Sequence, residues 1–176
     1  DLILEENPQD NLSLLDIGTG SGAIAISLKH ARPGWQVAAS DLSDDALAVA
    51  TENAHRHNTN IQFFRADVFR QVSGKYDIIV SNPPYVRNLE KQEIKKNVLE
   101  FEPHLALFVE DTDALLCYRK IAQLALKNLT ANGLLFFEIN QYLGKETVEL
   151  LENLGFKNIE LKKDIYGNDR MIKCKK

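Results

Sequence analysis

Cysteine and long apolar runs are scarce in this sequence, and both absences narrow the class of protein. The 176 residues contain two cysteines, Cys117 and Cys174, too few for a disulfide framework or for a structural zinc site. No apolar run approaches the roughly 18 residues that cross a bilayer, and the start of the chain has no signal-peptide pattern. We therefore expect a soluble domain that works in the reducing cytoplasm.

An excess of basic residues is also missing. The chain has 21 Lys and Arg residues against 25 Asp and Glu residues, which gives a net charge of -4. This balance argues against a domain that holds nucleic acid mainly through a basic face. The lysines at 162–163 and 173–176 are expected to be solvated strand ends. The first residue is Asp1 rather than Met, so we expect one domain over residues 1–176, cut from a longer protein.

Short apolar runs alternate with amphipathic stretches, the order that predicts strand–helix–strand units on a parallel sheet. Ser43 is a suitable N-cap for the second helix, and Asn58 is a suitable left-handed stop for it. The predicted fold class is α/β, a mostly parallel, doubly wound sheet with helices on both faces. Strands are expected at 12–17, 35–40, 61–66, 76–81, 134–139, 158–163 and 170–175, and helices at 23–31, 44–57, 89–100, 113–129 and 143–154.

A glycine-rich turn lies between the first strand and the first helix. Glycines there allow a sharp turn and let a ligand lie against bare amides at the helix N-terminus. The spacing Gly-x-Gly-x-Gly differs from the Gly-x-Gly-x-x-Gly of a dinucleotide turn. Asp16, directly before the turn, would repel a pyrophosphate and attract an ammonium group. We predict a ligand that carries a cation rather than a phosphate, bound by Asp16, Gly18, Thr19, Gly20, Ser21 and Gly22.

Two further carboxylates follow the second and third strands. Asp41 can accept hydrogen bonds from both hydroxyls of a ribose. Asp67 can accept one from an adenine amino group, with Val68 packed on the ring, and Leu42 is included in the same predicted cofactor site. Each acid alone is equally well explained as a helix cap or a solvated loop residue. Together, behind a glycine turn, the three acids fit a nucleoside with a cationic tail, namely S-adenosylmethionine.

The segment Ser81-Asn82-Pro83-Pro84-Tyr85 follows the fourth strand, where open parallel sheets place their chemistry. Two consecutive prolines have fixed φ angles and no amide hydrogens, so their carbonyl groups point in set directions. The Asn82 side-chain oxygen and the Pro83 carbonyl can then accept both hydrogens of a planar NH2 group, and Tyr85 offers an aromatic face. Such acceptors pull an amide nitrogen toward tetrahedral geometry and free its lone pair. We predict catalytic roles for Asn82, Pro83 and Tyr85, cofactor contact for Asn82, and substrate binding for Asn82, Pro83, Pro84 and Tyr85.

In this order and spacing, these motifs resemble those of class I methyltransferases that modify planar amino nitrogens. The stretch Phe101-Glu102-Pro103-His104-Leu105-Ala106-Leu107 is similar to the Tyr-Glu-Pro-x-x-Ala-Leu stretch of the HemK/PrmC family. Further residues sit where that family has them: Tyr118 to Ile121, Phe137 to Ile139, Gln141, Asp164, Gly167, Asp169 and Arg170. The resemblance implies the Rossmann-like fold of S-adenosylmethionine-dependent methyltransferases, with an antiparallel last strand.

The resemblance also implies a reaction. The methyl group of S-adenosylmethionine would pass to the glutamine side-chain amide in the Gly-Gly-Gln motif of peptide chain release factors, leaving S-adenosylhomocysteine. The chain departs from the family's usual sequence at two places: Asn140 stands where the family has Gly, and residues 111–115 stand where it has a Gly-rich stretch. Both places lie away from the transfer chemistry. The family also carries an N-terminal helical domain that helps to engage the release factor, and we expect it to be absent from this chain.

Three other functions stay open at this stage. The same motifs suit a glutamine of a ribosomal protein. An exocyclic amino group of a nucleic-acid base is a chemically similar target, but such enzymes extract the base from its stack and commonly need additional recognition surface. The third alternative is a subunit that binds the cofactor without catalysing a reaction, and such a subunit would not need Asn82-Pro83-Pro84-Tyr85. No metal is predicted, because His55 and His57 are best explained as a solvated helix end, and we expect neither a membrane nor a stable nucleic-acid complex.

Overall fold

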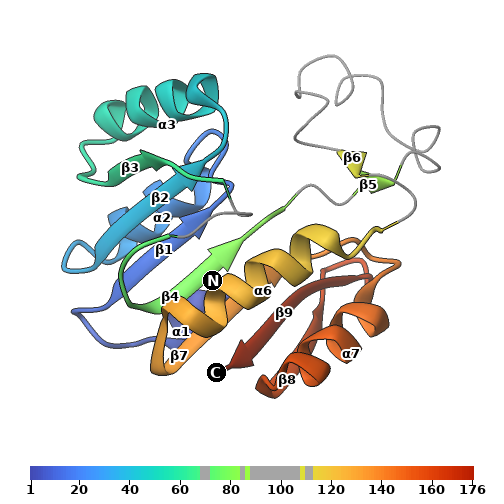
Figure 1. The fold of residues 1–176 in the computed structure, drawn as a ribbon. Coiled ribbons are helices and arrows are strands. Elements are labelled where there is room, and N and C mark those ends of the chain that lie inside the picture. Colours follow the sequence, from blue (N-terminus) through green and yellow to red (C-terminus); the bar gives the residue numbers. More distant parts are fainter. Residues whose placement is uncertain (68–71, 84–85, 88–107, 110–112) are drawn as a thin grey trace.

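Seven strands form one sheet in the order β3-β2-β1-β4-β7-β9-β8, as seen in a computed structural model that describes residues 1–67, 72–83, 86–87, 108–109 and 113–176 (Figure 1). Neighbouring strands from β3 to β7 are parallel, and β9 is antiparallel to both β7 and β8. The strands are β1 (Ser13–Ile17), β2 (Gln36–Asp41), β3 (Gln62–Arg65), β4 (Tyr76–Ser81), β7 (Leu129–Glu138), β8 (Lys157–Lys163) and β9 (Asp169–Lys175). The predicted doubly wound sheet with an antiparallel last strand is confirmed.

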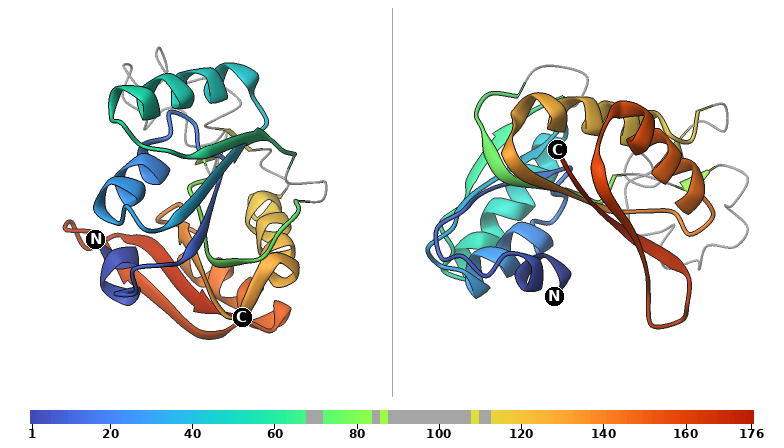
Figure 2. Two further views of the ribbon diagram at one scale, coloured as in Figure 1. Left: turned by 90° about the vertical axis from the view of Figure 1, so that its left-hand side faces the viewer. Right: turned by 90° about the horizontal axis from the view of Figure 1, so that it is seen from below.

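Helices cover both faces of this sheet (Figures 1 and 2). On one face lie α6 and α7, and on the other lie α1 and α2, with α3 beside β2 and β3. A separate parallel pair, β5 (Val86–Arg87) with β6 (Phe108–Val109), lies beyond the end of β4. The helices of the described residues are α1 (Leu2–Glu6), α2 (Ala23–Ala31), α3 (Asp44–Arg56), α6 (Leu116–Asn128) and α7 (Gly144–Leu154).

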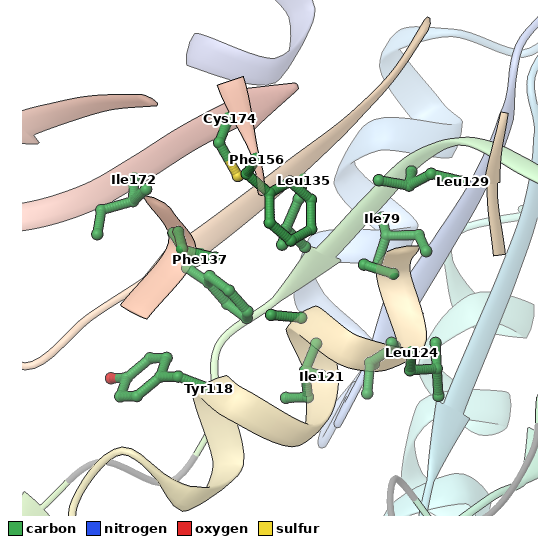
Figure 3. Packing of buried hydrophobic residues seen from close by; sticks show 14 of the residues in the cluster. Ile79, Tyr118, Ile121, Leu124, Leu129, Leu135, Phe137, Phe156, Ile172 and Cys174 are labelled. Carbon is green, nitrogen blue, oxygen red and sulfur yellow. The ribbon is translucent and has the colours of Figure 1, made fainter. Parts of the chain in front are cut away.

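The central strands are apolar on both faces because each face packs against a helical layer. Along β4, Ile78 belongs to the cluster under α2, whereas Ile79 belongs to the cluster under α6. Figure 3 shows the second cluster, in which Tyr118 of α6 packs edge-on against Phe137 of β7 at 5.4 Å between ring centroids. The buried carboxyl-terminal parts of β1 and β4 thereby support the loops that follow them.

Local signals set most helix ends as predicted. The Ser43 side chain accepts a hydrogen bond from the Ala46 amide at 3.2 Å, and Asn58 has a φ of 51°. The strand predicted from Leu134 begins instead at Leu129, because Leu129 pairs with Tyr76 across an irregularity in the register of β4. The preceding helix ends at Asn128, whose side chain donates to the carbonyls of Val72 and Gly74, both at 2.8 Å.

Lys173 contradicts the prediction that residues 173–176 are solvated. It is 8% exposed, and its Nζ lies 2.9 Å from Glu6 of α1 and 2.7 Å from Glu160 of β8. Glu6 lies near the other end of the chain and Glu160 lies opposite Lys173 in the β8–β9 pair, so the run of lysines itself gave no sign of either partner. The ion pair between Lys173 and Glu6 connects α1 to strand β9 of the sheet.

The helix predicted at 89–100 lies outside the described residues, as does the family-like stretch 101–107. In the described residues, no helix combines the length and the apolar character needed to cross a membrane.

Candidate functional site

The predicted site residues that the structure describes lie at one edge of the sheet, because the parallel strands that they follow all end there. Ile17 at the end of β1 is in register with Ser40 of β2 on one side and with Ser81 of β4 on the other. The chain leaves β1 toward β2 but returns on the other side as β4, which makes this position the switch point where open α/β sheets bind ligands. The Ser81 hydroxyl donates to the Ile17 carbonyl at 2.7 Å and ties the two strand ends together.

The glycine turn is fixed to the neighbouring strand by its backbone. The amides of Gly18 and Thr19 donate to the Ser40 carbonyl at 2.8 and 3.0 Å. Gly18 and Gly20 have φ angles of 70° and 55°, and a Cβ atom at either would meet nothing within 4 Å, so the turn is open to a ligand. Gly22 has a φ of 82°, and a Cβ there would lie only 3.1 Å from the Cβ of Ala50 in α3. Helix α2 then begins without a side-chain cap.

Asp16 is fully buried beneath this turn. Its Oδ2 accepts a hydrogen bond from the Thr19 hydroxyl at 2.7 Å, whereas its buried Oδ1 has no hydrogen-bond partner among the described residues. Burial raises the pKa of Asp16 to about 6, against the opposing effects of Thr19 and of the Ala25 amide, and the charge of Asp41 adds to the rise. The Ala25 amide favours the ionised form without completing a hydrogen bond to Oδ1. An unpaired buried carboxylate oxygen is costly, and a bound cation would relieve that cost.

Asp41 links the turn to the start of α3. Its Oδ2 accepts from the Gly20 amide at 2.9 Å, and its Oδ1 accepts from the Ser43 amide at 3.0 Å. These are the oxygens predicted to bind a ribose, and the sequence does not indicate that they also shape the turn. Each carboxylate oxygen has two lone pairs, so both can accept a further hydrogen bond.

Leu42 and Asp67 line one pocket of about 620 Å³ at the β3 side of the sheet. Phe64, Arg65 and Tyr76 also line it, and sequence reasoning missed all three. The alternation of strand residues was the available signal, because Phe64 and Ala66 lie on the same face and both pack against the α6 cluster. Val68, predicted to pack on an adenine ring, lies outside the described residues.

The segment Asn82-Pro83-Pro84-Tyr85, here called the acceptor motif, begins directly after β4. Ser81 is buried, Asn82 is exposed and Pro83 is buried again, so the Asn82 side chain is accessible while the backbone around it is held. Because Ser81 pairs with Ile17 and with Phe137, Asn82 leaves the sheet between the ends of β1 and β7. Pro84 and Tyr85 lie outside the described residues, and their predicted roles stay predictions.

Other reactive groups do not gather into a second site. Within the described ranges, no three His, Cys, Asp or Glu side chains form a group that could hold a metal ion. His55 and His57 are exposed around the end of α3. Cys174 is buried in β9, and burial raises the pKa of its thiol to about 12, which keeps it protonated and unreactive.

Comparison with known proteins identifies the family. Residues 1–104, more than half of the chain, match the family described as "Methyltransferase small domain". The chain belongs to this methyltransferase family. A crystal structure of a methyltransferase from Pyrococcus furiosus has the same fold as this domain, with a TM-score of 0.72 at 17% identity over 99% of this chain and 79% of that one.

Two curated relatives share much more of the sequence of this methyltransferase domain. The release factor glutamine methyltransferase of Flavobacterium psychrophilum is 65% identical over 165 residues, which are 93% of this chain and 58% of the relative. The protein of the same name from Bacteroides thetaiotaomicron is 49% identical over 175 residues, which are 98% of this chain and 63% of the relative. The chain thus spans less than two thirds of the length of either, and the resemblance to the HemK/PrmC family is confirmed.

The buried Asp16 makes the stability of the ligand-free domain depend on pH. Its pKa is about 6 in the folded state against 3.8 as the reference, so between these values the folded state holds more protons than the unfolded state. The free energy of unfolding should therefore fall as pH rises from 4 to 6, by on the order of 3 kcal/mol from this group. Asp16→Asn should abolish this component, measured as denaturant unfolding of both proteins at pH 4, 5, 6 and 7.

The matched variant for this prediction is Thr19→Val. It removes the hydrogen bond that favours ionised Asp16, so the pKa of Asp16 should rise further. The pH range over which the free energy of unfolding falls should then extend to higher pH. A stability difference between wild type and Asp16→Asn that stays constant from pH 4 to 7 would contradict the prediction.

Proposed function

We propose that this chain is the catalytic domain of an S-adenosylmethionine-dependent protein-glutamine N-methyltransferase. Its target is the glutamine side-chain amide in the Gly-Gly-Gln motif of peptide chain release factors, and S-adenosylhomocysteine is the other product. The observation that carries the proposal is the placement of Asn82 and Pro83 at the switch point, across from a buried carboxylate with an unpaired oxygen. The names of the two curated relatives support the choice of substrate.

The described residues fit S-adenosylmethionine, which when bound supplies an electrophilic methyl group on a positively charged sulfur. Asp16 Oδ1 would accept a hydrogen bond from the ammonium group, which would give that oxygen the partner that it lacks among the described residues. The open faces of Gly18 and Gly20 leave room for the backbone of the ligand, and Asp41 has lone pairs left for ribose hydroxyls. The pocket of Leu42, Phe64 and Asp67 is large enough for an adenine ring, with Asp67 as the acceptor for its amino group.

The acceptor motif prepares the nitrogen of the substrate. An amide nitrogen is a weak nucleophile because its lone pair is delocalised into the carbonyl group. The side-chain oxygen of Asn82 and the carbonyl of Pro83 would each accept one hydrogen of the glutamine NH2 group and draw the nitrogen toward tetrahedral geometry. The nitrogen loses its proton during or after transfer, so no strong base is required beforehand. Holding the reacting atoms in line is worth up to about 7–11 kcal/mol when the geometry is good.

Methyl transfer to a base of nucleic acid is the weaker candidate. The acceptor chemistry is alike, but the net charge of -4 gives the chain no general attraction to a polyanion. A ribosomal-protein glutamine offers the same amide and is separated from a release factor only by experiment.

The experiment that tests the proposal supplies isotopically labelled cofactor and the full-length protein to a release factor, to ribosomal proteins and to DNA. Mass spectrometry of the products then locates the label. We expect it on the glutamine of the Gly-Gly-Gln motif. Label on a ribosomal protein or on DNA, with none on the release factor, would overturn the choice of substrate.

Asn82→Ala in the full-length protein should lower kcat by about 10²- to 10³-fold, the range seen when one preorganised hydrogen-bonding group is removed from a reacting centre. The Asn82 side chain is exposed, so the fold should be unchanged and cofactor binding should remain measurable. Asn60→Ala, another exposed asparagine away from the switch point, is the control and should retain full activity. Equal activity of Asn82→Ala and wild type would remove Asn82 from the mechanism.

Asp41→Ala should weaken cofactor binding by about 1–3 kcal/mol, the scale of hydrogen bonds to a charged group. Part of this loss would come from the turn, because Asp41 also accepts from the Gly20 amide. Asp41→Asn keeps one oxygen acceptor and should lose less cofactor affinity than Asp41→Ala. The control Asp45→Ala, at an exposed acid of α3, should bind the cofactor as tightly as wild type does. Calorimetric titration measures all three, and unchanged affinity of Asp41→Ala would exclude Asp41 from the site.

A further inference from the structure

Exposed large apolar side chains are spread along the carboxyl edge of the sheet. Five such side chains are exposed in the described residues, and four of them follow strands at this edge: Leu42, Tyr142, Ile165 and Tyr166. The fifth, Val49, lies on α3. Leu42 belongs to the proposed cofactor pocket, but the other three have no role in the transfer chemistry. Ile165 and Tyr166 are the most exposed of all, at 92% and 83%.

Ile165 and Tyr166 form the tip of the turn between β8 and β9, and hydrogen bonds within the turn hold its shape. Asp164 Oδ1 accepts from the amides of Tyr166 and Asn168 at 2.9 and 3.0 Å. The Asp164 amide donates to the Asn168 carbonyl at 2.8 Å, and Gly167 takes a φ of 85° to close the turn. Asp164 and Gly167 thus shape a tip that holds two apolar side chains in water, where they do not stabilise the fold.

The tip lies on the same side of the molecule as the acceptor motif. Strand β8 runs in the direction of β7, because both are antiparallel to β9. The Ile139 amide, just after β7, donates to the Arg170 carbonyl at 2.8 Å, so residues 164–169 extend beyond the end of β7. Both views in Figure 2 show this hairpin projecting from the body of the domain. From strand spacing and rise, the tip is roughly 20 Å from Asn82, beyond the reach of the glutamine side chain itself.

Charges around the tip are already paired within the domain. Lys163 lies 2.7 Å from Asp169, Arg170 lies 3.4 Å from Asp164, and Lys162 lies 3.4 Å from Glu160. No cation of this group is left over to neutralise a phosphate backbone, so the tip suits an apolar surface of a protein rather than a nucleic acid. Tyrosine is enriched among the anchors of protein interfaces, and the exposed Ile165 adds apolar surface next to it in the sequence.

We propose that Ile165 and Tyr166 form a docking surface for the protein substrate, which they contact outside the segment that carries the target glutamine. This inference rests on the proposed function, because the partner is the release factor that supplies the glutamine. The contact orients the folded substrate while its glutamine enters the acceptor motif, and it adds nothing for an isolated glutamine-containing peptide.

The test uses the full-length protein with the double substitution Ile165→Ser and Tyr166→Ser. Methylation is measured with an intact release factor and with a short peptide around its Gly-Gly-Gln motif, and cofactor binding is measured by calorimetry. KM for the intact release factor should rise by about 10- to 100-fold. Activity on the peptide, cofactor affinity and Tm should stay at wild-type values, since both side chains are solvated. The control, Val49→Ser on α3, should behave as wild type with either substrate.

The outcomes separate the two proposals. Unchanged KM for the release factor in the double variant, with normal methylation by wild type, would overturn the docking surface and leave the proposed function standing. An equal loss on peptide and protein would also overturn it, because the hairpin would then act on the site itself. Absence of release-factor methylation by the wild-type protein would overturn the proposed function and the docking surface with it.

Discussion

The burial of a carboxylate under a glycine turn is the constraint on which the site depends. Asp16 has no exposed surface and has one oxygen without a partner among the described residues, and an unpaired buried oxygen costs free energy of folding. Thr19 and the turn hold it in place, and Asp41 holds the turn through the Gly20 amide. In the proposed function this oxygen accepts from the cation of the donor, and it would set where that donor lies relative to the neighbouring strands.

In the proposed mechanism the switch point brings the donor site and the acceptor motif together. A cation held at the end of β1 lies next to whatever follows β4, and the Ser81 hydroxyl bound to the Ile17 carbonyl keeps the two strand ends in register. Asn82 is therefore presented from a backbone that is buried on both sides of it in the sequence, Ser81 and Pro83. Rigid support is what a mechanism based on alignment requires, because small displacements of the acceptor groups would lose the in-line geometry.

Much of this could be predicted from the sequence, where local signals determine the structure. Strand β4 and helix α2 have the predicted bounds, since an apolar run and a glycine turn with a Pro-Gly break define them locally. Three features were not predicted: the burial of Lys173, the early start of β7 at Leu129, and the position of Tyr76 in the lining of the pocket. Each depends on a partner far along the chain, and no periodicity encodes such a contact.

In the proposed mechanism the acceptor motif faces the methyl group of the donor. This arrangement can be seen in a crystal structure of the full-length enzyme with S-adenosylmethionine and a glutamine-containing peptide. We predict that the ammonium group lies on Asp16, that the glutamine nitrogen is hydrogen-bonded to Asn82 and Pro83, and that the methyl carbon lies about 3–3.5 Å from that nitrogen. A methyl group directed away from Asn82, or an ammonium group remote from Asp16, would contradict the account.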